Sequence, residues 1–456
     1  MLKKKPKTEK IKITDAKEYT YRFRIYPNAE QLSFLIRQIG SIRFVYNFLL
    51  ERNNFLYEVH KIRYDYGNMQ RALKLMKKGF PFLTELNSQS LQGALVNLDN
   101  AFKRFFKHES KHPKFKSKKK LNAVSIPQHF KLDGNKLYIP KLKSPFVIKY
   151  RKRKPQETVK KVSISLTATG KFYVNMSVEK VFVPKPYTAQ VAGLDLGIKT
   201  FATVTTGISE TDKNTDKIDN PKYYLKSQKQ LVKVQRQLSK KQHPRYRGDT
   251  TKRSNNFVKE SKKLAKIYEK RTNQLIDFAH KSSLSVINDN QVVMVEDLNI
   301  IGMLKNKNLA KAIQNVAWSR FVSMLEYKAD YYGRTFQKVG RTYPSSKTCS
   351  TPGCDYVNKD LKLSDRFWIC PQCFRLHDRD ENASINMFMK ALEVRRVLPE
   401  PSTMTTPAEI AIADIRRLAF TKAPLLCQPK CAVPETASTL KSDLSLKQEA
   451  SSLRAR

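Results

Sequence analysis

Residues 191–199 read Val-Ala-Gly-Leu-Asp-Leu-Gly-Ile-Lys, and this segment is the most informative one about the fold. An apolar run of strand length ends on Asp195, Gly197 permits a tight turn, and the apolar residues 201–204 begin a second strand. The pattern predicts an acidic side chain at the end of a buried strand, facing a cleft. Taken alone, the same letters fit an aspartate in a hairpin turn equally well.

Two further carboxylate positions follow the same logic. The apolar strand predicted over 292–295 ends on Glu296 and Asp297. A carboxylate there must be paired, hydrogen-bonded or metal-bound, because its desolvation is otherwise costly. One of the two is therefore a metal-ligand candidate, and the other is expected to cap the following segment. Asp378 and Asp380 begin a predicted helix, where an aspartate is often only an N-cap.

Together these carboxylates favour a specific chemistry. Two acidic residues at strand ends and one at a helix start form the usual ligand set for two hard cations about 4 Å apart, which activate water and stabilise the leaving oxygen of a phosphodiester. RNase H-like sheets begin in this way. Actin-like ATPases begin similarly, but they need glycine-rich phosphate loops, and the chain has only 14 glycines.

Four of the six cysteines form two close pairs. Four residues separate Cys349 from Cys354, two separate Cys370 from Cys373, and fifteen lie between the pairs. Two such knuckles bind one tetrahedral Zn²⁺, and four thiolates leave no open position, so the zinc is expected to be structural. Cys427 and Cys431 form only a lone pair and are expected to be unliganded.

Length and charge indicate the partner. At roughly 150 residues per domain, 456 residues predict about three domains. The 87 Lys and Arg against 40 Asp and Glu give a net charge of +47, which a polyanion would neutralise. An anionic membrane is the rival partner, but the sequence has no apolar run of 18 residues and no signal segment. We expect an intracellular nucleic-acid-binding protein with no membrane association.

The N-terminal part combines strands and helices. Residues 17–26 alternate as a strand does, and Asn28 with Gln31 forms a capping box for a helix expected to end at Gly40, with further helices from Val45 and over 84–106. Nine of the eighteen residues over 103–120 are Lys or Arg. This stretch is either a solvated loop or a phosphate-tracking segment whose interleaved rings stack on bases; the rings are Phe105, Phe106, His108, His112 and Phe115.

Later strands complete the predicted organisation. Hairpins are expected around Asp133-Gly134-Asn135 and at Gly170. The chain is accordingly predicted to be a mixed α/β and β multidomain protein. Its parts are a basic arm (1–16), a β-rich domain (17–26 and 121–183) interrupted by a helical block (27–120), an α/β domain (188–390) and a loosely ordered tail (391–456).

The order of these motifs resembles the TnpB proteins, the OrfB-type products of insertion sequences, which are related to the type V CRISPR effectors. The resemblance covers about residues 17–390. It rests on Gly193-Leu-Asp-Leu-Gly197, Val295-Glu-Asp-Leu-Asn299, Ser345-Ser-Lys-Thr-Cys349, Cys370-Pro-Gln-Cys373 and His377-Asp-Arg-Asp-Glu-Asn-Ala383. In the family the first knuckle more often holds two intervening residues than four.

The resemblance implies a transposon-encoded RNA-guided DNA endonuclease associated with transposition. Its fold would be a β-barrel wedge domain interrupted by a helical recognition domain, followed by an RNase H-like (RuvC) nuclease domain with a zinc ribbon over 345–376. Carried over by motif, the Mg²⁺-binding catalytic residues are Asp195, Glu296 and Asp380, and Arg366 contacts the scissile strand.

The implied partners are DNA and a guide RNA from the protein's own element, in the cytoplasm and nucleoid of a prokaryote. A non-catalytic accessory or regulator of transposition, which binds DNA or RNA without cutting it, is the alternative.

Overall fold

The computed structural model describes residues 16–398 except 63, 118–121, 151–153, 245–248, 307–309, 311, 314–315 and 363. The predicted basic arm, apart from Ala16, lies outside the described residues, as do Cys427, Cys431 and most of the predicted tail. The boundary at 390 is placed too early, because the last helix, α9 (Arg379–Val397), continues through it. Ala391 and Leu392 are buried against the central sheet, and this packing extends the helix.

A single long helix, α1 (Ala29–His60), replaces the two that were predicted here. It begins with the expected capping box, in which the Asn28 side chain accepts from the backbone of Gln31 at 2.8 Å and the Gln31 side chain accepts in return at 3.0 Å. The predicted break at Gly40 is wrong. A mid-helix glycine costs only about 1 kcal/mol, and one buried face continues past it through Ile39, Ile42, Val45, Tyr46 and Leu49.

Three shorter elements complete the helical block: α2 (Tyr66–Gly79), the 3₁₀ turn η1 (Pro81–Leu83) and α3 (Ser88–Phe106). The helices and the nearby strands share one hydrophobic core, to which α1 contributes Leu35, α3 contributes Leu95, and the strands contribute Val124, Val162 and Val174. The helical block therefore packs on the β-rich part rather than forming a core of its own.

The β-rich part contains two antiparallel sheets. The first has the order β1-β7-β6-β2 and consists of β1 (Ala16–Ile25), β7 (Phe172–Val181), β6 (Val159–Leu166) and β2 (Ala123–Ile126). The second comprises β3 (Lys131–Asp133), β4 (Lys136–Tyr138) and β5 (Phe146–Val147). The two predicted hairpins are confirmed, with Gly134 at φ 55° and Gly170 at φ 82° in their turns. Closure of these strands into a barrel stays a prediction.

The second part of the chain is built on a five-stranded mixed sheet with the order β10-β9-β8-β11-β12. Strands β8 (Val191–Asp195), β11 (Val292–Glu296) and β12 (Thr335–Val339) run parallel, whereas β9 (Thr200–Gly207) and β10 (Lys213–Asp219) form an antiparallel meander beside them. The two strands predicted to end on acidic residues are therefore neighbours and point the same way.

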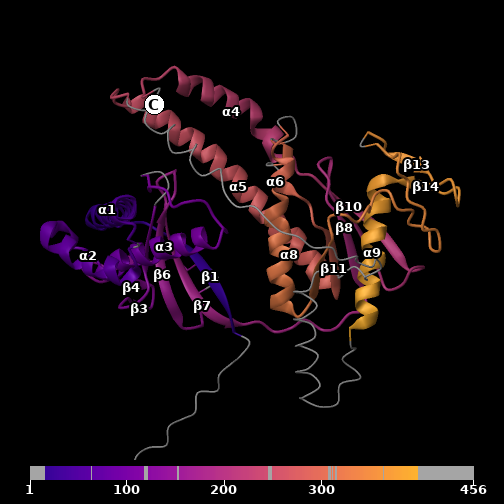
Figure 1. Ribbon diagram of the computed structural model, residues 1–456, viewed down its shortest axis with the longest axis horizontal. Helices are drawn as coiled ribbons and strands as arrows, with labels where there is room; N and C mark the ends of the chain where they lie inside the picture. Colours follow the sequence, from indigo (N-terminus) through magenta and orange to yellow (C-terminus); the bar gives the residue numbers. More distant parts are fainter. Residues whose placement is uncertain are drawn as a thin grey trace, which may run out of the picture. The chain divides into compact units, whose positions relative to one another are not determined.

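Helices cover both faces of this sheet. The alternating side chains of β8 and β11 bury Val191 and Met294 against Phe388 of α9 on one face. On the other face Leu194 and Val293 pack with α5 (Asn255–Asp289) and α8 (Trp318–Tyr332). The helix α4 (Tyr223–Ser239) lies along α5 as a long antiparallel pair, and a short helix, α6 (Ile300–Met303), follows β11 (Figure 1).

Two small strands, β13 (Phe367–Ile369) and β14 (Leu376–Asp378), pair just before α9. Cys370 and Cys373 lie between these strands, and Cys349 and Cys354 precede them. Among the described residues, no helix combines the length and apolar composition needed to cross a membrane.

Candidate metal sites

The register of the central sheet places four side chains in one row. Val295 pairs with Leu194, so Glu296 at the end of β11 lies level with Asp195 at the end of β8. Asp195 pairs with Thr203 of β9, and Thr203 pairs with Lys217 of β10. Because strand side chains alternate between faces and Gly193 faces α9, Asp195 points to the α9 side of the sheet.

Asp195 lies in a concentrated negative field. Burial, followed by the charges of Glu296 and Asp380, raises the pKa of Asp195 to about 7. Burial also raises the pKa of Glu296, which the positive charge of Arg379 opposes. Carboxylates from two other elements therefore act on Asp195, an arrangement that cations stabilise.

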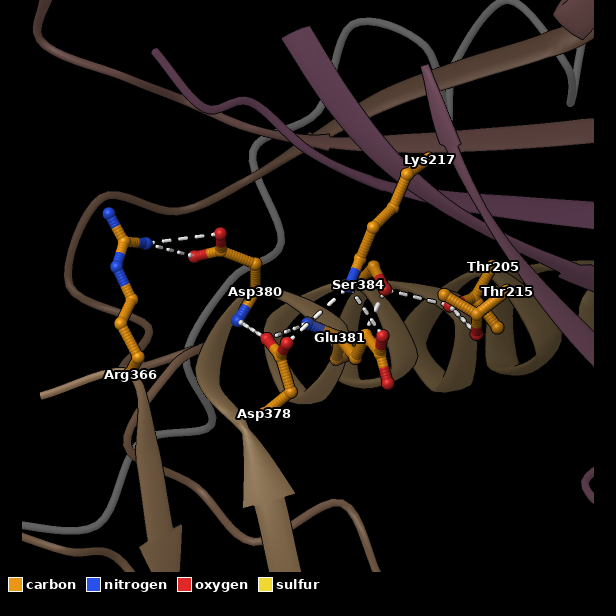
Figure 2. Close-up of polar contacts among 8 residues, drawn as sticks. All are labelled: Thr205, Thr215, Lys217, Arg366, Asp378, Asp380, Glu381 and Ser384. Carbon is orange, nitrogen blue, oxygen red and sulfur yellow. Dashed lines mark hydrogen bonds and ion pairs between the residues drawn. The ribbon is translucent and has the colours of Figure 1, made fainter. Parts of the chain in front are cut away.

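The first turn of α9 assigns different roles to its two aspartates. The Asp378 side chain is the N-cap and accepts hydrogen bonds from the backbone N–H groups of Asp380 (2.9 Å) and Glu381 (3.3 Å). Capping is thereby provided without the Asp380 carboxylate, whose two oxygens each lie 3.2 Å from Nη1 of Arg366 (Figure 2). Asp378 is therefore the N-cap of α9.

Glu296 and Asp297 are also distinguished. Asp297 pairs with Nε of Arg341 at 2.6 Å, and the next helix, α6, is capped by Asn299, whose side chain accepts from the Gly302 N–H at 2.9 Å. The expectation that the neighbour of the ligand candidate caps the following segment is wrong, because Asn299 is closer to the helix start. Glu296 makes no ion pair among the described residues.

The three carboxylates are not as tightly gathered as the cysteines. Within the described part of the chain, the four cysteines are the only group of three or more His, Cys, Asp or Glu residues whose metal-donor atoms all lie within 4.8 Å of one another. A centre of two cations about 4 Å apart spreads its ligands over more than one coordination sphere. Carboxylate oxygens are the donors that such hard cations prefer, so the residues present fit Mg²⁺.

The cysteine cluster has the dimensions of a zinc site. Sγ of Cys349 lies 3.6 Å from Sγ of Cys373, and Sγ of Cys354 lies 3.6 Å from Sγ of Cys370. These separations are too long for a disulfide and agree with the roughly 3.8 Å edge of a tetrahedron with Zn–S bonds of about 2.3 Å. The donor set therefore fits Zn²⁺.

A turn accommodates the longer first knuckle. The Cys354 N–H donates to the carbonyl of Thr351 at 3.0 Å, and Gly353 adopts φ 77°, a left-handed conformation that favours glycine. The Thr351 hydroxyl also lies 3.5 Å from Sγ of Cys373. Hydrogen bonds with this hydroxyl and with the Arg375 backbone lower the pKa of Cys373 to about 6, whereas burial raises the pKa of Cys349. Without a metal ion, Cys373 is therefore the thiol that most readily becomes a thiolate.

Two polar residues of these sites were missed by sequence reasoning. His377 is buried, with Nε2 3.1 Å from Sγ of Cys349, and such contacts orient metal ligands. Its position four residues after Cys373 was a usable signal. Lys217 pairs with Asp378 and Glu381, and nothing in the local pattern of its strand indicates this.

Three family models match the chain. The OrfB_IS605 model, described as "Probable transposase", matches residues 171–307, and the Cas12f1-like TNB domain matches 318–387. A third model, described as the helix-turn-helix domain of OrfB_IS605, matches 18–61. In this structure that last range holds β1 and α1, a strand followed by one helix.

The chain is also similar to curated proteins over most of its length. It is 35% identical over 377 residues to a "Putative RNA-guided DNA endonuclease" of Streptomyces pristinaespiralis, covering 82% of this chain and 89% of the relative. It is 28% identical over 388 residues to the "Putative RNA-guided DNA endonuclease InsQ" of Escherichia coli K12, covering 80% and 90%.

One solved structure supports the fold. The Cas12f1 chain of a cryo-EM complex with sgRNA and target DNA aligns with a TM-score of 0.50 and 14% identity, covering 82% of this chain and 99% of that one. This likeness shows a mixed α/β multidomain fold of the Cas12 type. With a relative 35% identical over four-fifths of the sequence, and with the carboxylate and cysteine motifs in the predicted order, the chain belongs to the TnpB (OrfB-type) family of insertion-sequence proteins.

Proposed function

We propose that this protein is a transposon-encoded RNA-guided DNA endonuclease that hydrolyses phosphodiesters with two Mg²⁺ ions. One observation carries the proposal: Glu296 and Asp195 end adjacent parallel strands, and burial, together with the charges of Glu296 and Asp380, raises the pKa of Asp195. Divalent cations would relieve this repulsion, and a buried carboxylate with a strongly shifted pKa beside two others favours a functional site.

Each residue has a distinct role in this proposal. Asp195, Glu296 and Asp380 would hold the cations, which supply an activated water and neutralise the leaving oxygen. Asp380 is held by Arg366, whose side chain is 52% exposed, so the guanidinium is also accessible to a phosphodiester strand. The buried sheet beneath the row keeps Asp195 and Glu296 fixed relative to one another.

The remaining parts would bind nucleic acid. In this proposal residues 188–397 are the RuvC-like nuclease domain with its ribbon at 345–376, residues 17–26 and 121–183 are the wedge barrel, and residues 27–120 are the recognition domain. A charge of +47 supports binding of a guide RNA from the same element together with DNA. Base pairing would then read the target sequence, while the protein contacts the duplex backbone.

Cleavage of matched DNA by the RNA-loaded protein tests the function. The protein, copurified with RNA transcribed from its own element, is expected to cut guide-matched DNA in Mg²⁺ and not in EDTA. Asp195→Ala, Glu296→Ala and Asp380→Ala are each expected to abolish cutting. Asp297→Ala is the matched control, since this neighbour of Glu296 is already paired with Arg341.

Two results would reject the proposal. Undiminished cutting by Asp195→Ala would show that Asp195 does not belong to the catalytic site. Tight binding of RNA and DNA by the parent protein, without scission in any divalent cation, would instead indicate the accessory or regulatory role.

A further inference from the structure

We propose that Lys217 of β10 is a positioning residue, which fixes the first turn of α9 on the central sheet and thereby places Asp380 for cation binding. The inference rests on the proposed function, because Asp380 is a cation ligand there. Lys217 lies in the same row across the sheet as Asp195 and Glu296, at the opposite end from Glu296.

Lys217 contacts two carboxylates that flank Asp380. Its Nζ lies 2.6 Å from Oε1 of Glu381 and 3.4 Å from Oδ2 of Asp378 (Figure 2). These residues lie one position after and two positions before Asp380. Among the described residues, Lys217 is the sheet side chain that forms ion pairs with this turn.

One of these contacts leads directly to the backbone of Asp380. The same Asp378 carboxylate that pairs with Lys217 accepts hydrogen bonds from the N–H groups of Asp380 and Glu381. Lys217 therefore restrains the rotamer of the residue that caps Asp380. A loose cap would let the first turn fray, because the first N–H groups of a helix have no partner within it.

The rest of α9 is fixed to the sheet independently. The hydroxyls of Thr215, Thr205 and Ser384 form a chain at 2.9 and 2.7 Å, and Ser384 donates to the carbonyl of Glu381 at 2.9 Å (Figure 2). Gly193 also lets the helix backbone approach β8 closely. These sheet contacts begin at Ser384, one turn after Asp380, and the ribbon holds Asn382 and the Asp380 carboxylate from the other side. Loss of Lys217 would therefore loosen the Asp378 cap without releasing the helix.

The stability of the fold should depend little on Lys217. Its side chain is 42% exposed and that of Glu381 is 43% exposed, and ion pairs between exposed groups contribute little to folding stability. A positioning role also predicts a specific direction for the change in cation affinity. Removing a positive charge beside a cation site would tighten cation binding through space, whereas loss of ligand placement would weaken it.

The experiment compares Lys217→Gln and Lys217→Arg with the parent in two measurements. The first is Mn²⁺ binding to the RNA-loaded protein by calorimetry, and the second is the Mg²⁺ concentration for half-maximal cleavage. We expect Lys217→Gln to weaken Mn²⁺ binding about tenfold and to raise the Mg²⁺ requirement equally, with little change in melting temperature. Lys217→Arg should keep both the Mn²⁺ affinity and the Mg²⁺ requirement close to those of the parent.

Lys213→Gln is the matched control. Lys213 lies on the same strand and the same face, and its Nζ donates to the carbonyl of Glu210 at 2.7 Å rather than to α9. The variant removes one positive charge from β10 and should leave Mn²⁺ binding unchanged.

The outcomes separate this role from the function on which it rests. Unchanged or tighter Mn²⁺ binding by Lys217→Gln, while Asp380→Asn loses it, would overturn the positioning role alone. If Asp380→Asn binds Mn²⁺ like the parent, Asp380 is no ligand, and the proposed function fails together with the role.

Discussion

Asp195 combines two opposing requirements in one side chain. A cation site needs its carboxylate charged, but burial and the neighbouring charges of Glu296 and Asp380 raise the pKa of that carboxyl from 3.8 to about 7. Between these values the folded protein holds a proton that the unfolded chain has lost. The free energy of unfolding therefore falls as the pH rises from about 4 to about 7, and the loss is complete above the folded pKa.

Neutralising Asp195 should therefore stabilise the protein while it inactivates the site. In buffer without Mg²⁺ at about pH 8, Asp195→Asn is expected to raise the free energy of unfolding by roughly 1–4 kcal/mol, the upper figure being the full shift of pKa. The variant should also flatten the pH dependence and cut no DNA. Denaturant unfolding at several pH values measures the change.

Asp289→Asn is the control, since Asp289 is exposed at the end of α5. Its unfolding should match the parent. A less stable Asp195→Asn protein at pH 8 would show that the Asp195 charge is compensated in the fold.

The close packing of α9 on β8 depends on Gly193, which has no side chain. A Cβ at Gly193 would collide with the backbone N of Phe388 and lie 2.5 Å from the carbonyl oxygen of Ser384. Both obstacles are backbone atoms of a helix and cannot move separately. The helix that carries Asp380 is thereby held against the strand that carries Asp195.

Gly193→Ala is expected to destabilise the protein by about 3 kcal/mol or more and to lower cleavage, because α9 must move away from β8. Thermal unfolding of the parent and the variant measures the effect. Gly93→Ala in α3 is the control: nothing lies within 4 Å of the added Cβ, so helix propensity should stabilise the protein by up to about 1 kcal/mol. Equal melting of Gly193→Ala and the parent would contradict this packing.

The cysteine ribbon supports the start of the same helix. The Asn382 and Asn386 amides each donate to the carbonyl of Thr348 at 2.7 Å, and Arg366 of the ribbon pairs with Asp380. Thr348 directly precedes Cys349, so the position of the first knuckle is transmitted to α9.

Loss of one thiolate should therefore displace Asp380 in the carboxylate site. Cys370 is fully buried, and Cys370→Ser is expected to lose zinc and most cleavage, because Asp380 is no longer held. Metal analysis of the purified variants measures zinc content beside activity. Cys427→Ser, outside the described residues and predicted to be unliganded, should keep both. Full activity in a zinc-free Cys370→Ser protein would show that the ribbon does not support α9.

The whole molecule is dominated by its charge of +47. Such an excess is stable in a compact chain when a polyanion offsets it, and each phosphate neutralised releases condensed counterions. Affinity for the guide RNA should then depend steeply on salt.

We expect binding of the copurified RNA to weaken by about 10³-fold or more between roughly 50 and 200 mM salt, as for a protein with at least six phosphate contacts. Filter binding of radiolabelled RNA across this range gives the slope. The Asp195→Ala variant should show the same slope as the parent, since it changes no phosphate contact. A nearly flat dependence would mean that few of the basic residues face the RNA.

The features that could be predicted from the amino-acid sequence are those encoded by neighbouring residues. The strands ending on Asp195 and Glu296, the turns at Gly134 and Gly170, and the capping box at Asn28 all follow from local periodicity and backbone preference. The cysteine spacing likewise predicted a cluster that the structure assembles.

Other features depend on contacts between segments far apart in the chain. The register that sets Glu296 level with Asp195, the path of α1 through Gly40, the division of roles between Asp378 and Asp380, and the reach of Lys217 to α9 are all of this kind. Local sequence states which side chains are available. Packing free energy and the field of distant charges decide where they meet, and both arise only when the sheet and its helices are assembled.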